Sequence, residues 1–443
     1  MGIKVAKFGG TSLANAEQIK KVQNIIENDS NIKYVVPSAP GKRNKDDNKI
    51  TDLLYLCHAH VKNEIPFDDV FKIIHDRYIS IVRELGLNIN IEKYLDEVKK
   101  NIENGASKDY TASRGEYLNG LIIAELLGFD FVDPADIIFF DKNGRVDMNK
   151  TISAVRSVMK KHEKAVIPGF YGTSNEDGSG EGKVKTFPRG GSDITGAIIA
   201  RGVNAEIYEN WTDVSGLLMA DPKIVKDPKP IDTITYRELR ELAYMGANVL
   251  HDEAIFPVRE VGIPIKIKNT NKPEDPGTLI VQDAAPITHS GTITGVAGKK
   301  DFTVIMVEKA LMNKELGYGR RLLSILEANG ISFEHMPSGI DTISLVIADS
   351  ELEGKLDKVI MEIKSECNPD TVEVYPNMAL IATVGRGMAY TPGIAGRLFS
   401  ALGNEGINVR MIDQGSSEIN IIIGVEIEDF ERAIRAIYKA FVK

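Results

Sequence analysis

The sequence predicts an α/β protein with more than one domain. In the first half, apolar β-branched runs alternate with helical patterns, which is typical of layered α/β folds. Near the end of the chain, a unit of the type β-α-β-β occurs twice. The 443 residues also exceed the size at which one core usually keeps growing, so about two to four domains are expected.

The alternation predicts the order of elements in the first half. A strand, a helix, a second strand and a long helical stretch are expected at residues 3–8, 14–27, 34–36 and about 51–104. Further strands are expected at residues 131–133, 165–169, 205–209 and 264–268. Polar, breaker-rich residues predict a mobile surface loop at 40–49 and a second loop at 172–182.

The repeated unit is visible as an alignment without a gap. GYGRRLLSILEANGISF (317–333) matches GIAGRLFSALGNEGINV (393–409), each read as a helix that ends at a glycine before a strand. Strands are expected before the helices at 302–307 and 378–384, and after them at 344–348 and 419–425. Residues 271–291 carry three prolines and little periodicity, which predicts a domain boundary there.

Composition excludes several functional classes. Hydrophobic residues make up 43% and charged residues 26%, as in an ordinary soluble protein. The net charge of −9 argues against a general binder of nucleic acid or of anionic membranes. Two distant cysteines favour a reducing, cytoplasmic setting without a disulfide framework, and neither a signal peptide nor a membrane span is expected.

The first candidate site is KVAKFGGTSL at residues 4–13. Gly9 and Gly10 let backbone N–H groups approach an anion, Ser12 adds a hydroxyl, and Lys7 supplies a charge for phosphate oxygens. The order differs from a Walker A loop, in which the lysine follows the glycines. A tight turn with a capping hydroxyl explains this stretch about equally well.

A second glycine site is KTFPRGGSDITGAIIA at residues 185–200. Ser192 and Asp193 follow two glycines and are good N-cap residues for a helix. Arg189 stands just before the turn, where its guanidinium could clamp a carboxylate or phosphate. A surface arginine beside a capped helix is the plainer reading. Two such turns in one α/β domain predict two facing anion sites at the carboxyl edge of the sheet.

Together these stretches resemble the aspartokinases of the amino-acid kinase superfamily. The resemblance rests on KFGGTS, FPRGGSD and WTDVSG, and it continues through VVPSAPG, KITDLL, SRGEYLNG, PGFYG, ADPKIV, YMGANVLHDEAI and PIKIKNT. It implies an amino-acid kinase fold, with an open, mainly parallel sheet between helical layers, over residues 1–285. Two ACT domains of the βαββαβ type are implied at 286–371 and 372–443. In the family, the strand at 292–298 can pair with the second ACT unit instead of the first.

The family's reaction is MgATP plus L-aspartate giving ADP and 4-phospho-L-aspartate, the first step of lysine, threonine and methionine biosynthesis. Because the acceptor carboxylate is ionised at neutral pH, the reaction needs no general base. Catalysis would consist of in-line positioning and charge neutralisation. The Mg²⁺ ligands are not predictable, because magnesium often relies on substrate phosphates and water.

The resemblance also implies roles for individual residues. Catalysis is assigned to Lys7, Arg189 and Asp193. Aspartate binding is assigned to Ser38, Thr51, Glu116, Arg189 and Ser192, with Arg189 on the α-carboxylate and Glu116 on the α-ammonium. ATP binding is assigned to Lys7, Gly9, Gly10, Ser12, Thr212, Asp213 and Lys223.

Several of these assignments have plainer alternatives. Glu116 could belong to a solvated helix face, and Ser38 and Thr51 could be helix or loop caps. Trp211 is read as a core aromatic. Two departures from the family pattern are Asn248, where many relatives have lysine, and His251-Asp252, where His-Pro is common.

The ACT units imply regulation by an end-product amino acid, lysine first and threonine second. The implied effector site consists of Asn313, Leu316, Gly317, Gly319, Glu334 and Ser338. A homodimer or a dimer of dimers through the ACT units is expected, and the alternative is that both units serve dimerisation alone. Two competing functions remain: a kinase acting on acetylglutamate, glutamate or UMP, and an amino-acid sensor with a degenerate kinase half.

Overall fold

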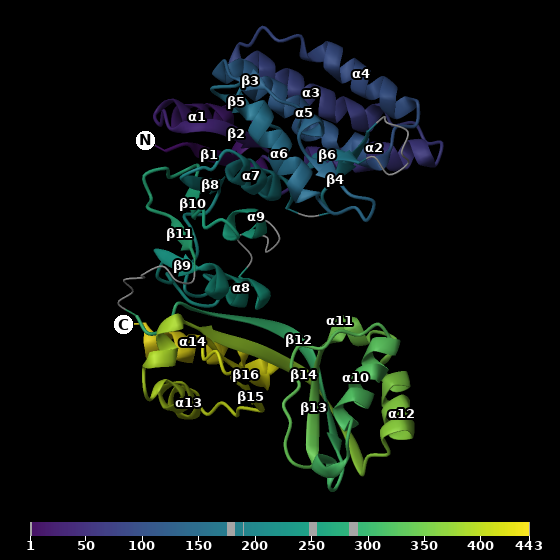
Figure 1. The fold of residues 1–443 in the computed structure, drawn as a ribbon, viewed down its shortest axis with the longest axis vertical. Coiled ribbons are helices and arrows are strands. Elements are labelled where there is room, and N and C mark those ends of the chain that lie inside the picture. Colours follow the sequence, from purple (N-terminus) through teal and green to yellow (C-terminus); the bar gives the residue numbers. More distant parts are fainter. Residues whose placement is uncertain (1, 175–181, 189, 248–254, 283–290, 443) are drawn as a thin grey trace. The chain divides into compact units, whose positions relative to one another are not determined.

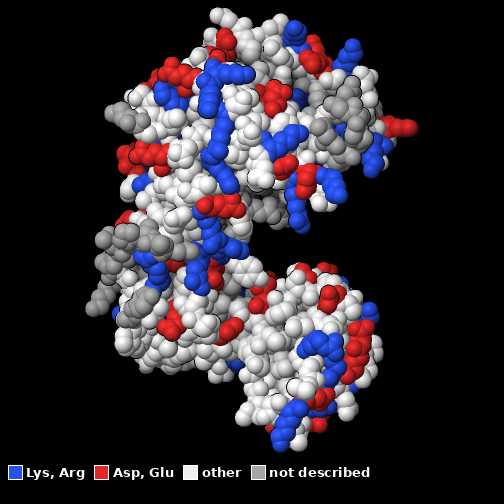
Figure 2. Space-filling view, in the orientation of Figure 1, with Lys and Arg blue, Asp and Glu red and all other residues white. Residues whose placement is uncertain are grey.

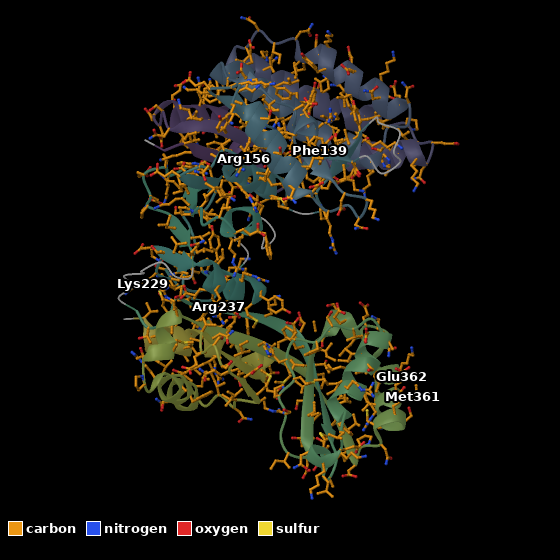
Figure 3. All side chains as sticks on the ribbon, viewed as in Figure 1. Phe139, Arg156, Lys229, Arg237, Met361 and Glu362 are labelled. Atoms are coloured by element: carbon orange, nitrogen blue, oxygen red, sulfur yellow. The ribbon has the colours of Figure 1, made fainter. Side chains whose placement is uncertain are left out.

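The computed structural model describes residues 2–174, 182–188, 190–247, 255–282 and 291–442 (Figure 1). It divides into two compact units. The first takes residues 1–217, 232–236 and 249–287, and the second takes 218–231, 237–248 and 288–443. Lys229 and Arg237, labelled in Figure 3, mark the two mid-chain segments that belong to the second unit. The predicted division at residues 285 and 371 stays a proposal.

The first unit is built on one eight-stranded sheet with the order β3-β5-β2-β1-β8-β10-β11-β9. All neighbouring strands are parallel except β10 and β11. The strands are β1 Lys4–Phe8, β2 Ile32–Pro37, β3 Asp130–Phe131, β5 Ala165–Val166, β8 Ile207–Thr212, β9 Thr233–Thr235, β10 Ile265–Asn269 and β11 Thr278–Val281. A smaller sheet holds β4 Phe139–Phe140, β6 Tyr171–Ser174 and β7 Lys183–Thr186.

Helices cover both faces of the large sheet. The helices of this unit are α1 Ala16–Glu27, α2 Ile50–Lys62, α3 Asp68–Leu85, α4 Ile91–Glu103, α5 Lys108–Leu127, α6 Met148–Met159, α7 Gly191–Gly202 and α9 Phe256–Arg259. Apolar side chains of α1 to α5 form one core with Ala6 and Phe8 of β1, whereas α7 packs on β1, β2 and β8 and is backed by α6 and α9. The predicted mainly parallel sheet between helical layers is confirmed.

Three predictions for this unit differ from the structure in detail. The helical stretch at 51–104 is three helices, α2, α3 and α4, because Pro66 interrupts it once and the left-handed Gly86 (φ 67°) ends α3. The loop at 40–49 has exposed side chains, but its Asp47 is tied to Arg77 of α3 at 2.7 Å, so it is an anchored segment. Of the loop predicted at 172–182, residues 172–174 belong to β6 Tyr171–Ser174, and residues 175–181 lie outside the described part of the chain.

The second unit contains an antiparallel sheet with the order β13-β12-β14-β16-β15. Its strands are β12 Gly295–Glu308, β13 Thr342–Ala348, β14 Thr371–Val384, β15 Met411–Asp413 and β16 Asn420–Glu426. Its helices are α8 Tyr236–Tyr244, which starts in the first unit, and α10 Tyr318–Ala328, α11 Asp349–Leu352, α12 Leu356–Cys367, α13 Ile394–Asn404 and α14 Phe430–Phe441.

The two repeats share this sheet through long strands. The first residues of β12, 295–299, pair with 380–384 of β14, and the later residues, 302–308, pair with β13 and with 371–378 of β14. Each repeat keeps its own apolar core, one around α10 and α12 and one around α13 and α14. The strand expected after Gly330 is not formed, because residues 331–341 make only two isolated bridges to β13.

Charged side chains of both signs lie on the face drawn in Figure 2. On the face in Figure 2, acidic and basic side chains of each unit are interspersed. No described helix combines the length and apolar character that crossing a membrane requires.

Candidate active site

Strand β1 and helix α7 bring together two residues that the sequence places far apart. Side chains alternate along β1, so Ala6 and Phe8 join the apolar core while Lys7 faces α7. The Lys7 Nζ atom lies 2.6 Å from Oδ1 of Asp193 in the first turn of α7. Lys7 is only 7% exposed. Lys7 and Asp193, which the sequence analysis assigned to catalysis without linking them, therefore form a buried ion pair at one face of the sheet.

Asn210 completes this group, and sequence reasoning missed it. Its Nδ2 donates to Asp193 Oδ1 at 2.8 Å, and its Oδ1 accepts from Lys7 Nζ at 3.5 Å. Lys7 and Asn210 stand opposite each other in the parallel strands β1 and β8. The available signal was the polar pair Glu209-Asn210 at the end of a predicted strand, but Asn210 has meaning for the site only once β1 and β8 are known to be neighbours.

The Gly9-Gly10 turn directly follows β1. The Gly9 amide donates to the Trp211 carbonyl at 3.0 Å, so it extends the pairing of β1 with β8. The expectation that this amide binds a phosphate is therefore wrong. A Cβ at Gly9 would lie 3.6 Å from Lys7 Nζ, which means that a side chain there would cover the ammonium. A Cβ at Gly10 would lie 2.9 Å from the Ala39 carbonyl, so only glycine fits the close approach.

The hydroxyl residues of this turn are not helix caps. Residues Gly10–Leu13 form a short 3-10 helix, and α1 begins only at Ala16, where Asn15 accepts from the Gln18 amide. The Ser12 hydroxyl lies 2.8 Å from the Thr270 hydroxyl beyond β10. The capping alternative for this turn is therefore wrong, and Ser12 instead links two strand ends of the sheet.

The second glycine turn starts α7. Gly190 adopts a left-handed conformation (φ 58°) and is the N-cap, without a side-chain cap. The predicted N-cap role of Ser192 and Asp193 is therefore wrong; both lie inside the first turn. A Cβ on Gly169 would come within 2.5 Å of Ser192, so the chain after β5 closely approaches this turn. Arg189 lies outside the described residues.

Glu116 lies on α5 and is not part of a solvated face. It is 5% exposed, and among the described residues its Oε2 atom has no hydrogen-bond partner. Burial raises the pKa of Glu116 to about 8, although the Ala39 amide and nearby Arg114 favour the ionised form. A buried carboxyl with one unused oxygen is suited to receive a cation from a ligand.

Ser38 and Thr51 lie on segments that border the same region. The Ser38 amide donates to the Phe8 carbonyl at 3.1 Å, and its carbonyl accepts from Asn119 of α5 at 2.7 Å. Thr51 lies in the first turn of α2, whose N-cap is Lys49, so the capping alternative for Thr51 is wrong.

Of the residues expected to bind the nucleotide at the end of β8 and after it, only Thr212 and Asp213 belong to the first unit. Thr212 ends β8, and its hydroxyl lies 3.2 Å from Asp213 Oδ1. Trp211 is a core residue, 3% exposed, stacked on Phe8 at 5.8 Å and bonded to Glu209 at 2.9 Å. Lys223 belongs to the second unit, where its amide donates to Asp221. Asn248, His251 and Asp252 lie outside the described residues.

These residues gather at one edge because β1, β2 and β8 end together. Phe8 is in register with Pro37 of β2 and with Trp211 of β8, so the residues that follow each strand come to the carboxyl edge of the sheet. Lys7, Gly10, Ser38, Asp193 and Thr212 all lie at or beside this edge. The described residues contain no group of three or more His, Cys, Asp or Glu side chains that could hold a metal ion.

The residues expected to bind an effector lie in the second unit. Gly317 is the left-handed N-cap of α10 (φ 79°), Gly319 has open space around its Cα, and Leu316 is 95% exposed. Asn313 lies in a short 3-10 helix, Met312–Lys314, just after β12.

The remaining two expected effector residues lie along β13. Ser338 pairs with Ile343, whereas the Glu334 amide donates to Val346, three strand positions or roughly 10 Å away. The Glu334 carboxylate accepts a hydrogen bond from Tyr244 of α8, which together with burial raises the pKa of Tyr244 to about 12. Glu334 is therefore already in contact with a second element of its own unit.

Comparison with known proteins identifies this arrangement. A model of the amino acid kinase family matches residues 2–269, and an ACT domain model matches residues 381–441. Aspartokinase 3 of Bacillus subtilis is 37% identical over 454 residues, covering 99% of this chain and 98% of that protein. Aspartokinase 1, chloroplastic, of Arabidopsis thaliana is 30% identical and covers 99% of this chain and 80% of that protein.

Solved structures show the same fold. The aspartate kinase of Clostridium acetobutylicum, described as an allosteric enzyme, superposes with a TM-score of 0.93 at 63% identity, covering 99% of this chain and all of that one. Aspartokinase III of E. coli, in complex with aspartate and ADP, superposes with a TM-score of 0.74 at 24% identity over 99% of both chains. The matched family model, the relatives and the fold agree: this chain belongs to the amino acid kinase family and, within it, to the aspartokinases, which are phosphotransferases.

Proposed function

We propose that this aspartokinase transfers the γ-phosphoryl group of MgATP to the side-chain carboxylate of L-aspartate at the carboxyl edge of the large sheet. The observation that carries this assignment of the site is the buried group of Lys7, Asp193 and Asn210 beside the Gly9-Gly10 turn. A lysine held there by an acid and an amide has a fixed position, and the turn next to it leaves room for an anion. The product would be 4-phospho-L-aspartate, which starts lysine, threonine and methionine biosynthesis.

The chemistry follows from charge. The aspartate carboxylate is ionised at neutral pH, so one of its oxygens attacks the γ-phosphorus in line, the bond to the bridging oxygen breaks, and ADP leaves. Two anions must meet, and Lys7 offsets their repulsion while the Gly10 amide faces the transferring group. Mg²⁺ would neutralise the phosphates, and most of its ligands would be phosphate oxygens and water, as is usual for this ion.

Aspartate would be held through its α-ammonium and α-carboxylate groups. Glu116 would accept the α-ammonium, an assignment supported by its burial and its unused Oε2 atom. Arg189 would pair with the α-carboxylate because a planar guanidinium matches a carboxylate bidentately. Ser38, Thr51 and Ser192 would add hydrogen bonds from the segments around the site.

The nucleotide would occupy the other side of the edge. Lys7, Gly10 and Ser12 would contact the phosphates, and Thr212 and Asp213 would contact the rest of the nucleotide, while the assignment of Lys223 to ATP stays a prediction. We keep Gly9 as a residue of this site for the space it leaves beside Lys7, and not for its amide, which is bonded to Trp211.

A matched pair of lysine variants tests the site. Lys4 lies on the same strand, in ion pairs with Asp29 at 2.6 Å and Glu209 at 3.2 Å. In a coupled assay of ADP release, Lys7→Met is expected to lower aspartate-dependent turnover at least about a hundredfold, whereas Lys4→Met keeps it within a few-fold. Equal rates for both variants would remove Lys7 from the mechanism, and ADP release with glutamate as fast as with aspartate would contradict the acceptor.

We also propose that lysine, or alternatively threonine, regulates the enzyme at the residues around Gly317 and Glu334. The acid at Glu334 would receive the effector's ammonium, and the turn at Gly317 would offer amides to its carboxylate. The site would form between ACT units of a homodimer or a dimer of dimers. For the E. coli enzyme, a complex with lysine and aspartate is known.

Titration calorimetry with lysine and threonine tests this regulation. Glu334→Gln is expected to weaken lysine binding at least tenfold, while Glu327→Gln, an exposed acid on α10, leaves it unchanged. Unchanged lysine binding in the Glu334→Gln variant would show that the effector binds at a different site.

A further inference from the structure

Arg77 is a buried arginine on α3 that the assigned site does not use. It is 3% exposed. Its Nη2 atom donates to both carboxylate oxygens of Asp47, at 2.7 and 2.8 Å, and its Nη1 atom donates to the Gly41 carbonyl at 3.1 Å. All three bonds go to the loop between β2 and α2, so one side chain fixes both ends of the segment 41–47.

Stability alone gives little reason for this arrangement. Removing an arginine and an aspartate from water costs free energy that their attraction often fails to recover, and apolar residues of similar volume pack at least as well. Arg43, half-exposed on the loop itself, also binds Asp47 through its Nε atom at 2.9 Å, so the carboxylate would keep a partner without Arg77. What Arg77 adds is the bond to the Gly41 carbonyl, which fixes a backbone position.

That backbone position lies against the glycine turn that follows β1. The Gly41 amide donates to the Gly10 carbonyl at 2.8 Å. A Cβ on Gly41 would come within 2.6 Å of the Gly10 carbonyl carbon, so the two main chains touch without any side chain between them. A shift of Gly41 therefore cannot be absorbed by a rotamer change, and it moves the Gly10 peptide.

The next residue on α3 supports the other side of the same loop. The Tyr78 hydroxyl donates to the Gly115 carbonyl of α5 at 2.7 Å. A Cβ on Gly115 would meet the Ala39 side chain at 2.9 Å, and the Ala39 amide binds the Glu116 carboxyl. Arg77 and Tyr78 thus brace the loop 38–50 from one helix, between the glycine turn and the carboxyl that is assigned to the substrate ammonium.

We propose that Arg77 is a positioning residue for phosphoryl transfer, which acts by holding Gly41 and hence the Gly9-Gly10 turn in place. The inference rests on the proposed function, because it takes this turn as the place where the transferring phosphoryl group lies. Arg77 touches neither substrate; it fixes the Gly10 amide, a donor whose value is greatest in the transition state. A displacement of about 1 Å in such groups can lower a rate about a hundredfold, while ground-state binding of aspartate and ATP changes less.

The test compares Arg77→Lys with Arg83→Lys, the same exchange at an exposed position of α3. Lysine keeps the charge and can reach Asp47, but it cannot bind Asp47 and Gly41 in the same geometry. We expect Arg77→Lys to lower kcat at least tenfold with the KM values for aspartate and ATP within threefold of the native enzyme. Arg83→Lys should leave kcat and both KM values unchanged.

Several outcomes would overturn the inference. A folded Arg77→Lys enzyme with kcat within twofold of native, or with raised KM and unchanged kcat, would contradict it. If Arg77→Lys does not fold, Asp47→Asn replaces it, and kcat within twofold of native in that folded variant would contradict the inference as well. Failure of both variants to fold would show a requirement for folding and not for rate, which also overturns it. Absence of aspartate-dependent ADP release in the native enzyme would instead refute the proposed function.

Discussion

Replacing Glu116 with glutamine should change how the stability of the first unit depends on pH. Burial raises the pKa of this carboxyl from 4.5 to about 8 in the folded chain. Between these values the folded state holds the proton more tightly than the unfolded state does. The contribution of Glu116 to the free energy of unfolding is therefore highest below pH 4.5 and falls as the pH rises through this interval toward 8.

The size of the effect follows from the same two values. At 1.36 kcal/mol per pH unit, the difference between the two pKa values lowers the free energy of unfolding, relative to its value below pH 4.5, by about 5 kcal/mol above pH 8, about 3 kcal/mol at pH 7 and about 1 kcal/mol at pH 5. Glutamine cannot ionise, so it lacks this cost. The stability of Glu116→Gln relative to the native protein should thus rise by about 2 kcal/mol between pH 5 and pH 7.

The protein carries its own probe for this measurement. Trp211 is the single tryptophan, and it is buried against Phe8 in the core of the first unit. Urea unfolding followed by its fluorescence at pH 5, 6, 7 and 8, without substrates, reports on the unit that contains Glu116. Glu125→Gln, at an exposed position of α5, is the matched control and should follow the native curve.

Parallel pH curves for the native protein and Glu116→Gln would refute the reasoning, because they would mean that the carboxyl does not titrate in this interval. Aspartate should act in the opposite direction. Its ammonium stabilises the ionised carboxyl, so aspartate affinity should increase between pH 6 and pH 8 in the native enzyme and lose this dependence in the glutamine variant.

Three further changes have defined outcomes. Asn210→Leu removes the amide that bonds Asp193 beside Lys7, and kcat should fall about tenfold or more with little change in KM; an unchanged kcat would contradict its role. Gly10→Ala forces a methyl group against a carbonyl at 2.9 Å, so thermal unfolding of the first unit should show a loss of about 1–3 kcal/mol, and an unshifted melting curve would show that the turn can relax. Tyr244→Phe frees the Glu334 carboxylate and should tighten lysine binding severalfold in calorimetry, whereas weaker binding would place the hydroxyl in the effector site.

Local patterns in the sequence were enough to predict the sheet and the two glycine turns. Lys7, Gly9 and Gly10 are close together in the chain, so their position at the end of β1 could be predicted without knowledge of distant contacts. The mainly parallel order of the large sheet follows from the alternation of strands and helices. These features could be predicted because each depends on a local motif or on the order of elements along the chain.

The missing parts of the site depend on contacts between distant segments. Asn210 becomes meaningful only when β8 lies next to β1, and the Arg77–Asp47 pair joins a helix to a loop that was predicted to be mobile. The Gly9 amide is used by the Trp211 carbonyl, which a motif cannot reveal. In each case a partner from elsewhere in the fold decides what the residue can do.

The close packing of α7 explains how a buried lysine can be both stable and useful. A Cβ on Gly196 would come within 2.6 Å of the Tyr208 ring, so a glycine at this position lets the helix lie directly on β8. Tyr208 in turn donates to the Asp193 carbonyl at 3.1 Å, which fixes the first turn of α7 over the sheet. The carboxylate of Asp193 then meets Lys7 as a matter of packing, and the cost of burying the ammonium is offset by a partner already in place. An incoming phosphate can compete for the same charge, because the turn beside Lys7 has no side chain to exclude it.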